Sequence, residues 1–231
     1  MSIVITGNPG VGKHTITKKI SKKMNLPIID INVIAKDSEV IEKRENTNDV
    51  DTQKLAIIVN EMKLDGKIVV GHLAPYVLEK NQVKKIIILR RNPYHLESVY
   101  KERDYSENKI KENVGSEILG IITHDTIEKF EEKAFQIDVS EKNIEQVVEK
   151  ALQIISEKGN GEEVDWLDLV TKNNDLEKFE EKAFQIDVSE KNIEQVVEKV
   201  LQIISEKGKG EQVDWLDLVT KNNDLEKFFT H

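Results

Sequence analysis

The first half of the chain alternates short runs of β-branched residues with longer segments whose apolar residues recur at helical spacing. This alternation is typical of a parallel sheet whose strands are joined by crossover helices, so an α/β fold is expected. The predicted strands are Ser2 to Thr6, Pro27 to Ile31, Lys67 to Gly71, and Lys84 to Arg90. The predicted helices are Lys13 to Met24, Thr52 to Leu64, Pro93 to Lys101, and Glu107 to about Glu132.

An internal repeat dominates the second half. The segment EKFEEKAFQIDVSEKNIEQVVEK begins at Glu128 and again at Glu177, which makes the period 49 residues. Solenoid proteins need at least three copies and diverge more, so two nearly identical copies indicate a tandem duplication. Each copy offers one strand and one helix, namely Ala134 to Asp138 with Ser140 to Glu157, or Ala183 to Asp187 with Ser189 to Glu206.

Five strands complete a sheet of this kind, so the two copies compete for one position. In the first copy Ser140 is the predicted N-cap, and Gly159 and Gly161 are predicted to end the helix. Loop entropy, about 0.6 kcal/mol per doubling of length, favours this copy over the more distant one. Residues 1–176 are therefore expected to form a domain with a five-stranded parallel sheet flanked by helices, and residues 177–231 a duplicated strand-helix appendage. Exchange of the identical elements between two chains would give a domain-swapped dimer.

The composition narrows the class of protein. The 231 residues are 38% hydrophobic, which is enough for one sizeable core. The absence of cysteine excludes disulfides, thiolate metal sites and a cysteine nucleophile. No apolar stretch approaches the roughly 18 residues of a membrane helix, and the net charge of -9 argues against nonspecific nucleic-acid binding. A soluble, cytoplasmic protein with neither a membrane nor a direct nucleic-acid partner is expected.

The segment between the first strand and the first helix has the spacing of a P-loop. It reads Gly7-Asn8-Pro9-Gly10-Val11-Gly12-Lys13-His14-Thr15. Its three glycines allow a tight turn that directs backbone N–H groups inward, and the following helix adds its positive end. Lys13 would supply a cation for the β and γ phosphates of a nucleotide such as ATP. The alternative is a glycine turn that binds nothing, but the placement after the first strand favours the phosphate site.

The metal side of this loop departs from the usual pattern. A P-loop normally has Ser or Thr after its lysine because a hydroxyl oxygen suits Mg²⁺, whereas His14 offers a poor magnesium ligand. Thr15 lies one residue too late to replace that hydroxyl, although it can touch the α phosphate. Asp30 lies at the carboxyl end of the second strand, where ligands gather in such sheets. It either holds magnesium through water or faces solvent.

Several segments in order resemble the adenylate kinase isoenzyme 6 family of small P-loop NTPases. They are TGNPGVGKHT at the first strand, INVIAK after the second, VVGHLAP at the third, LRRNP after the fourth, and YKERDYSENKIKENVGSEIL beyond it. The resemblance implies a five-stranded parallel sheet, phosphoryl transfer from ATP to AMP and ATPase side activity. It also implies a role in small-subunit ribosome maturation, with a small-subunit ribosomal protein as partner.

The same resemblance implies roles for individual residues. Lys13 and its loop would hold the donor phosphates, and Arg103 in a short lid would contact the transferring phosphoryl group. Lys36 stands where the family has an AMP-side arginine, and it keeps the charge but loses the bidentate fork. His72 matches the histidine of the family's Asp-x-His element, so it is a catalytic candidate, and Val70 falls on the position of the aspartate.

Three functions remain open on the sequence. The first is an adenylate kinase with weak ATPase activity. The second is a nucleotide-gated ribosome-assembly module whose chemistry is weakened by His14 and Val70. The third is a kinase of another small phosphate acceptor, because such kinases share the fold.

Overall fold

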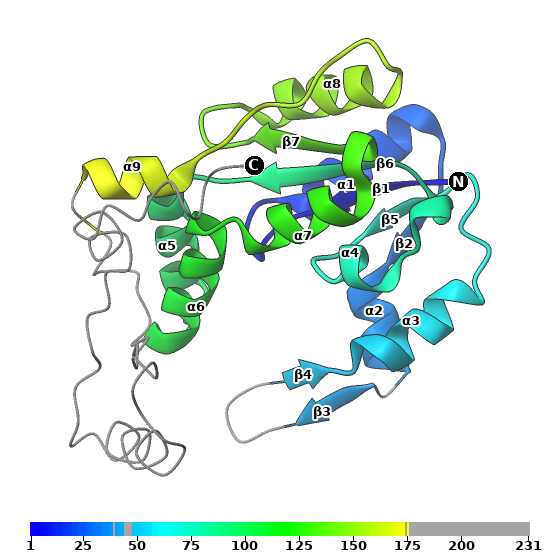
Figure 1. The fold of residues 1–231 in the computed structure, drawn as a ribbon, viewed down its shortest axis with the longest axis horizontal. Coiled ribbons are helices and arrows are strands. Elements are labelled where there is room, and N and C mark those ends of the chain that lie inside the picture. Colours follow the sequence, from blue (N-terminus) through cyan, green and yellow to red (C-terminus); the bar gives the residue numbers. More distant parts are fainter. Residues whose placement is uncertain (39, 44–47, 174, 176–231) are drawn as a thin grey trace, which may run out of the picture. The chain divides into compact units, whose positions relative to one another are not determined.

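A five-stranded parallel sheet forms the centre of the fold (Figure 1). The computed structural model describes residues 1–175 except residues 39, 44–47 and 174. The strand order is β2-β5-β1-β6-β7. The strands are β1 Ser2–Thr6, β2 Ile28–Asp30, β5 Ile68–Val70, β6 Val83–Arg90 and β7 Ala134–Asp138. The predicted fold class is confirmed, and the ends of the strands differ from the predicted ones by at most one residue.

The first copy of the repeat supplies the fifth strand. β7 pairs in parallel with β6, from Ile86 opposite Ala134 to Arg90 opposite Asp138. The prediction that the first copy fills this position is thereby confirmed. The second copy lies outside the described residues, so the boundary between residues 176 and 177 and the swapped dimer stay predictions.

Helices cover both faces of the sheet. In Figure 1, α1 and α8 lie on one face, and α4 and α7 lie on the other. The helices are α1 Lys13–Met24, α2 Ile31–Asp37, α3 Thr52–Asn60, α4 Ala74–Val77, α5 Pro93–Glu102, α6 Glu107–Ile118, α7 Ile121–Phe130, α8 Ile144–Ile155 and α9 Trp166–Lys172. Single 3₁₀ turns occur at Lys80–Gln82 and Glu131–Lys133. Within the part of the chain that the structure describes, no helix has the length and apolar character needed to cross a bilayer.

A short antiparallel hairpin, β3 Ile41–Lys43 and β4 Asn48–Val50, stands apart from the main sheet. The sequence did not predict it. Three-residue strands that contain charged and amide residues produce no β-branched run, so the pattern used for the other strands is absent here.

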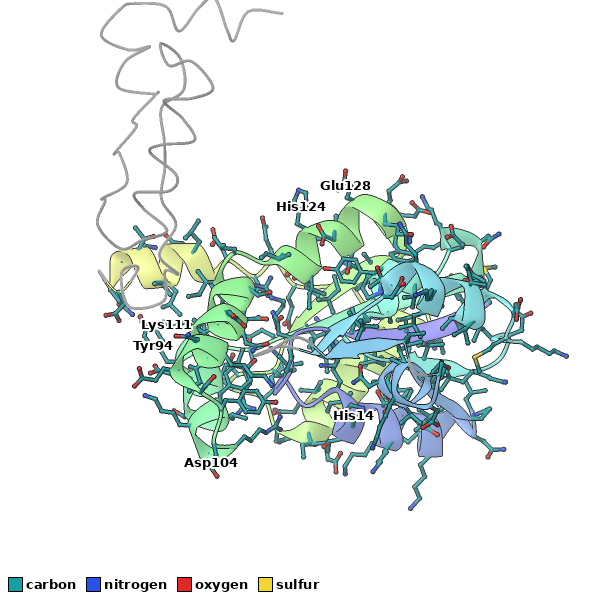
Figure 2. All side chains as sticks on the ribbon, turned by 90° about the horizontal axis from the view of Figure 1, so that it is seen from below. His14, Tyr94, Asp104, Lys111, His124 and Glu128 are labelled. Atoms are coloured by element: carbon teal, nitrogen blue, oxygen red, sulfur yellow. The ribbon has the colours of Figure 1, made fainter. Side chains whose placement is uncertain are left out.

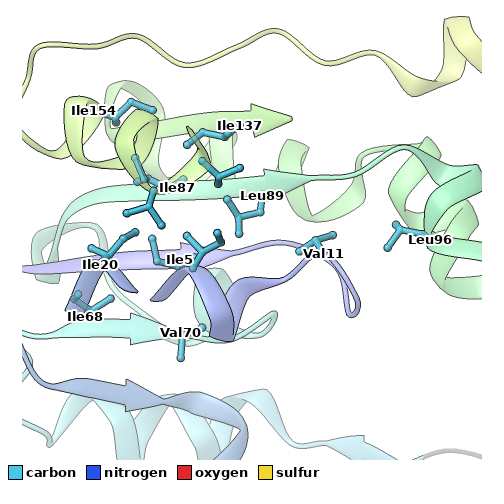
Figure 3. Packing of buried hydrophobic residues seen from close by; sticks show 14 of the residues in the cluster. Ile5, Val11, Ile20, Ile68, Val70, Ile87, Leu89, Leu96, Ile137 and Ile154 are labelled. Carbon is cyan, nitrogen blue, oxygen red and sulfur yellow. The ribbon is translucent and has the colours of Figure 1, made fainter. Parts of the chain in front are cut away.

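The alternation of side chains along β1 divides the core into two layers. Ile3 and Ile5 pack into the cluster that contains Ile20 of α1 and residues of α8, which Figure 3 shows from close by. Val4 packs into the opposite cluster with Leu55 of α3. Burial of both faces holds β1 in the middle of the main sheet. The five strands of this sheet are parallel, so their carboxyl ends meet at one edge. That edge carries the P-loop.

The prediction of one long helix from Glu107 to about Glu132 is wrong, because this segment forms two helices. α6 ends at Ile118, and α7 begins at Ile121 with Gly120 as its N-cap. Gly120 has a φ of 64°, in the left-handed region that glycine adopts without steric cost. The apolar spacing continues across this break, so the periodicity alone concealed it.

The limits predicted for α8 are also wrong. The N-cap is Asn143, whose side chain and that of Gln146 cap each other's backbone N–H, while Ser140 accepts a hydrogen bond from the N–H of Asn92 at 2.7 Å. At the other end, α8 stops at Ile155, before either predicted glycine. Gly161 instead lies against the edge strand, where a Cβ would be 3.1 Å from the backbone nitrogen of Gln136.

Candidate functional site

The glycines of the P-loop are required by its backbone. Gly7 has a φ of 128°, and a Cβ there would lie 2.3 Å from the carbonyl oxygen of Leu89 in β6. Gly12 has a φ of 93° and forms the N-cap of α1 without a side-chain hydrogen bond. The first N–H groups of α1 therefore have no capping side chain, and phosphate oxygens are suitable acceptors for such groups.

Helix α5 supports the loop from behind. The hydroxyl of the fully buried Tyr100 donates a hydrogen bond of 2.5 Å to the carbonyl oxygen of Pro9. A Cβ on Gly10 would lie 3.1 Å from the Tyr100 ring and 3.2 Å from Leu96, so the loop packs closely on this helix. Tyr100 also stacks on Tyr105, with ring centroids 5.3 Å apart and planes 6° apart. The P-loop is thereby connected through aromatic packing to the segment that joins α5 to α6.

Lys13 is a buried cation beneath this loop. Only 5% of the residue is exposed, and Nζ donates to the carbonyl oxygen of Asn8 at 2.8 Å. Burial lowers its pKa to about 8, an effect that Glu117 and Asp30 oppose and Arg103 reinforces. A polyphosphate would favour the charged form of Lys13, so the environment of this residue suits an anionic ligand.

Behind the loop, a buried carboxylate collects four hydrogen bonds. Glu117 of α6 is 1% exposed and accepts from Asn8 Nδ2 at 2.6 Å, Arg90 Nε at 2.7 Å, the backbone N–H of Arg91 at 3.0 Å, and Trp166 Nε1 at 3.0 Å. Buried charge is tolerated when it is paired and its oxygens are hydrogen-bonded, as here. The network joins the P-loop, β6, α6 and α9.

Arg90, the last residue of β6, and Arg91, which follows it, both have structural contacts in this region. Arg90 donates from its second terminal nitrogen to the Glu117 carbonyl oxygen at 2.7 Å and from its first to Gln136 at 3.0 Å, and it is buried. Arg91 donates to the carbonyl oxygen of Gly10 at 3.2 Å, and its buried Nε has no partner among the described residues.

The sequence reasoning missed Glu117. A signal for it existed, because Glu117 lies seven residues after Ile110 and three after Val114, which are positions on the buried face of α6. An acidic residue at an apolar-face position indicates a buried polar partner. Trp166 begins a short helix, α9, and the contact of its indole with Glu117 places this helix in the same network.

His14 and Asp30 are brought together at the front of the loop. His14 Nε2 lies 2.7 Å from Asp30 Oδ2, and the side chains are 49% and 22% exposed. The other oxygen of Asp30 accepts from the backbone N–H of Asn32 at 2.9 Å and so caps α2. Asp30 therefore has two partners among the described residues, and its contact with magnesium through water stays a prediction. Figure 2 shows His14 at the start of α1.

The residues present do not match a magnesium ion held directly by the protein. Mg²⁺ prefers oxygen ligands, and the residue after Lys13 offers an imidazole. Val70 is buried among apolar residues of the core and offers no ligand. Asp30 is the carboxylate that contacts His14. Among the described residues, no three His, Cys, Asp or Glu side chains are grouped so that they could hold a metal ion.

The other predicted residues occupy different parts of the same edge. His72 follows β5 and is half-buried, and burial together with repulsion by Lys13 lowers its pKa to about 4, with Asp30 opposing the shift. The imidazole is therefore neutral at pH 7. Arg103 is exposed at the C-cap of α5, one residue before Asp104, which Figure 2 labels at the turn between α5 and α6.

Two predicted contact residues are exposed. Thr15 lies in the first turn of α1, and Lys36 lies in the last turn of α2. Their roles in nucleotide contact stay predictions.

Comparison with known proteins gives the family of the chain. The family model described as "AAA domain" matches residues 3–120. A protein of Saccharolobus solfataricus described as "Putative adenylate kinase" is 33% identical over 159 residues, which cover 66% of this chain and 82% of that protein. A protein of Methanococcus maripaludis with the same description is 34% identical over 181 residues, 73% of this chain and 96% of that protein. A solved shikimate kinase from Bacteroides thetaiotaomicron has a TM-score of 0.43 at 22% identity, with 68% of this chain and 98% of that chain covered.

Proposed function

Because the chain belongs to the AAA domain family and to the adenylate-kinase-like family of these archaeal relatives, we propose that it transfers the γ-phosphoryl group of ATP to AMP. Family membership makes it a phosphotransferase with a nucleotide-binding P-loop. The finer proposal is the reaction ATP + AMP to 2 ADP, with weak ATPase activity. The predicted setting is the cytoplasm, with the isoenzyme 6 type of role in small ribosomal subunit maturation.

The observation that carries the proposal is the buried Lys13 beneath a glycine loop at the carboxyl edge of the sheet. Burial lowers the pKa of Lys13 to about 8, with Glu117 and Asp30 opposing this effect and the cation of Arg103 adding to it. Two cations near one loop favour a ligand with several negative charges, and ATP is such a ligand.

In this reaction the protein forms no covalent bond with the substrates, and its residues position the phosphates and stabilise their charge. An oxygen of the AMP phosphate forms a bond to the γ phosphorus, the bond from that phosphorus to the β–γ bridging oxygen breaks, and both products are ADP. Lys13 would hold the donor phosphates, and Arg103 would neutralise charge on the moving phosphoryl group. Lys36 on α2 would contact the AMP phosphate as a point charge. Magnesium would accompany ATP through phosphate oxygens and water, with Asp30 reached through water.

The proposal is tested by ADP formation. Purified protein is incubated with Mg²⁺, ATP and AMP, and ADP is measured for the wild type, Lys13→Ala and Lys18→Ala. Lys18 is an exposed lysine of the same helix and serves as the matched control. We expect ADP from the wild type and the control, and none above background from Lys13→Ala. If shikimate or another small molecule competes with AMP and is phosphorylated faster, AMP is not the preferred phosphate acceptor of the enzyme.

A second function is favoured by one contact, the pairing of His14 with Asp30 at 2.7 Å. That pairing occupies the position where a P-loop hydroxyl would approach magnesium, which favours a nucleotide-gated assembly module with little turnover. The variants His14→Thr and Val70→Asp restore oxygen ligands. A large gain in turnover with magnesium supports this module, and no gain supports an active enzyme with another metal arrangement.

A further inference from the structure

The His14–Asp30 pair differs in chemistry from the metal position of an ordinary P-loop. It offers one imidazole nitrogen and one carboxylate oxygen, 2.7 Å apart. His14 directly follows Lys13 in the chain, and Asp30 is the last residue of β2. Asp30 Oδ1 is held by the N–H of Asn32, so the carboxylate is fixed with Oδ2 toward His14. The side chains are 49% and 22% exposed, so both are accessible.

A mixed nitrogen and oxygen ligand pair selects among divalent ions. Imidazole suits zinc, nickel, copper and iron, whereas Mg²⁺ requires hard oxygen ligands and sheds water reluctantly. Across the first transition row the affinity of a nitrogen-containing site rises from Mn²⁺ through Co²⁺ to Ni²⁺. Replacement of a hydroxyl by an imidazole therefore lowers the suitability of the site for magnesium and raises it for a transition metal.

The separation of the two atoms suits a shared ion. Two ligands at about 2.1 Å from one ion lie about 3.0 Å apart at the right angle of an octahedral shell and about 3.4 Å apart in a tetrahedral one. The distance between His14 Nε2 and Asp30 Oδ2 needs to open from 2.7 Å by about 0.3 Å for the octahedral value and by about 0.7 Å for the tetrahedral one. Rotation of the exposed His14 side chain provides such a movement without displacing the backbone.

We propose that His14 and Asp30 form a binding site for a divalent transition-metal ion, of the Mn²⁺, Co²⁺ or Zn²⁺ class, that enters with the nucleotide and is preferred over Mg²⁺. The protein supplies two ligands, and phosphate oxygens and water complete the shell. This inference rests on the proposed function only in that a nucleotide must occupy the P-loop. It does not require that phosphoryl transfer take place.

The direct test is spectroscopic. The protein is loaded with Mn²⁺ and a non-hydrolysable ATP analogue, and pulsed electron paramagnetic resonance detects any ¹⁴N nucleus bound to the manganese. We expect an imidazole nitrogen signal in the wild type and its loss in His14→Thr. The control is His124→Gln, because His124 lies on α7 with Asp125 at 3.8 Å and Glu128 at 4.0 Å and is a second histidine beside carboxylates. Figure 2 shows His124 and Glu128 together on that helix, away from His14.

A measurement of nucleotide affinity with two metals adds a second variant, so that the test does not depend on His14→Thr alone. The ATP analogue is titrated into the wild type, His14→Thr and Asp30→Asn in the calorimeter, once in the presence of Co²⁺ and once in the presence of Mg²⁺. Asn at position 30 keeps a side-chain oxygen that can cap α2. Loss of a metal ligand should lower the ratio of Co²⁺ to Mg²⁺ affinity about tenfold or more in both variants. An equal ratio in all three proteins, or a nitrogen signal that survives in His14→Thr, overturns the proposal.

The outcomes separate this inference from the proposed reaction. Nucleotide bound without a nitrogen signal overturns the metal site and leaves phosphoryl transfer standing. A nitrogen signal without ADP formation in the presence of AMP supports the metal site and contradicts the kinase. Failure to bind nucleotide with any of the metals contradicts both.

Discussion

Asn8 of the P-loop donates a hydrogen bond of 2.6 Å to Glu117 of α6, across a separation of 109 residues in the chain. The same carboxylate accepts from Arg90 and Trp166, so the shape of the loop depends on a buried charge that no P-loop pattern contains. Trp166 extends this dependence to α9, at the end of the first repeat copy.

Glu117→Ala should destabilise the protein strongly. It leaves the buried guanidinium of Arg90 without its charge partner, which costs about 3–5 kcal/mol. For a protein of this size that loss lowers the melting temperature by about 6–20 °C. Glu112→Ala, an exposed position on the same helix, should stay within about 0.5 kcal/mol of the wild type. Thermal unfolding monitored by circular dichroism checks both, and equal melting temperatures for the two variants would show that the network is not stabilising.

The sheet could be predicted because its strands leave a local trace. The apolar runs within Ser2–Thr6 and Ile86–Leu89 are buried on both faces, and such runs are visible without any knowledge of the partners. The break at Gly120 is different, since a single glycine is tolerated inside helices and the apolar spacing continues past it. At α8, Ser140 and Asn143 are both good N-cap residues, and the tertiary contact from Asn92 to Ser140 is not local information.

ATP binding should be linked to uptake of a proton by Lys13. Burial lowers the pKa of Lys13 to about 8 in the free protein, and phosphate oxygens stabilise its charged form and raise that pKa. Below about pH 8 both states carry the proton, so this group gives no pH dependence. As the pH rises above 8 the free protein loses the proton that the complex keeps, so affinity falls and binding takes up a proton.

Calorimetry in buffers of different ionisation enthalpy, from about pH 7 to about pH 9.5, measures this uptake. Lys13→Arg keeps its charge throughout this range, so its residual affinity should lack the dependence. Proton release by the wild type on binding would contradict the assignment of Lys13 as the phosphate contact.

Arg103→Ala should reduce turnover more than nucleotide affinity. Arg103 is exposed at the end of α5, and its charge is close enough to lower the pKa of Lys13. A contact made mainly in the transition state changes kcat by about 10²-fold or more. Lys101→Ala is the control, because Lys101 pairs with Glu97 at 2.6 Å on the same helix. Steady-state rates and equilibrium titration of ATP separate the two effects, and an equal loss in both would assign Arg103 to ground-state binding.

The P-loop could be predicted from the sequence, whereas the side-chain contacts between distant residues of the site could not. The P-loop glycines and Lys13 follow one another in sequence, so their chemistry is visible in the motif. His14 and Asp30 meet although β5 lies between β1 and β2 in the sheet, and only the strand order brings the start of α1 to the end of β2. Glu117 required the same long-range information.

The central claim is that this chain binds a nucleoside triphosphate through Lys13, and a calorimetric titration with ATP tests it most directly. The wild type, Lys13→Ala and the exposed-lysine control Lys18→Ala are titrated under identical conditions. A charge-assisted phosphate contact contributes about 1.5–3 kcal/mol, so Lys13→Ala should bind ATP at least roughly tenfold more weakly, with the control unchanged. An ATP affinity in Lys13→Ala equal to that of the wild type would contradict the account.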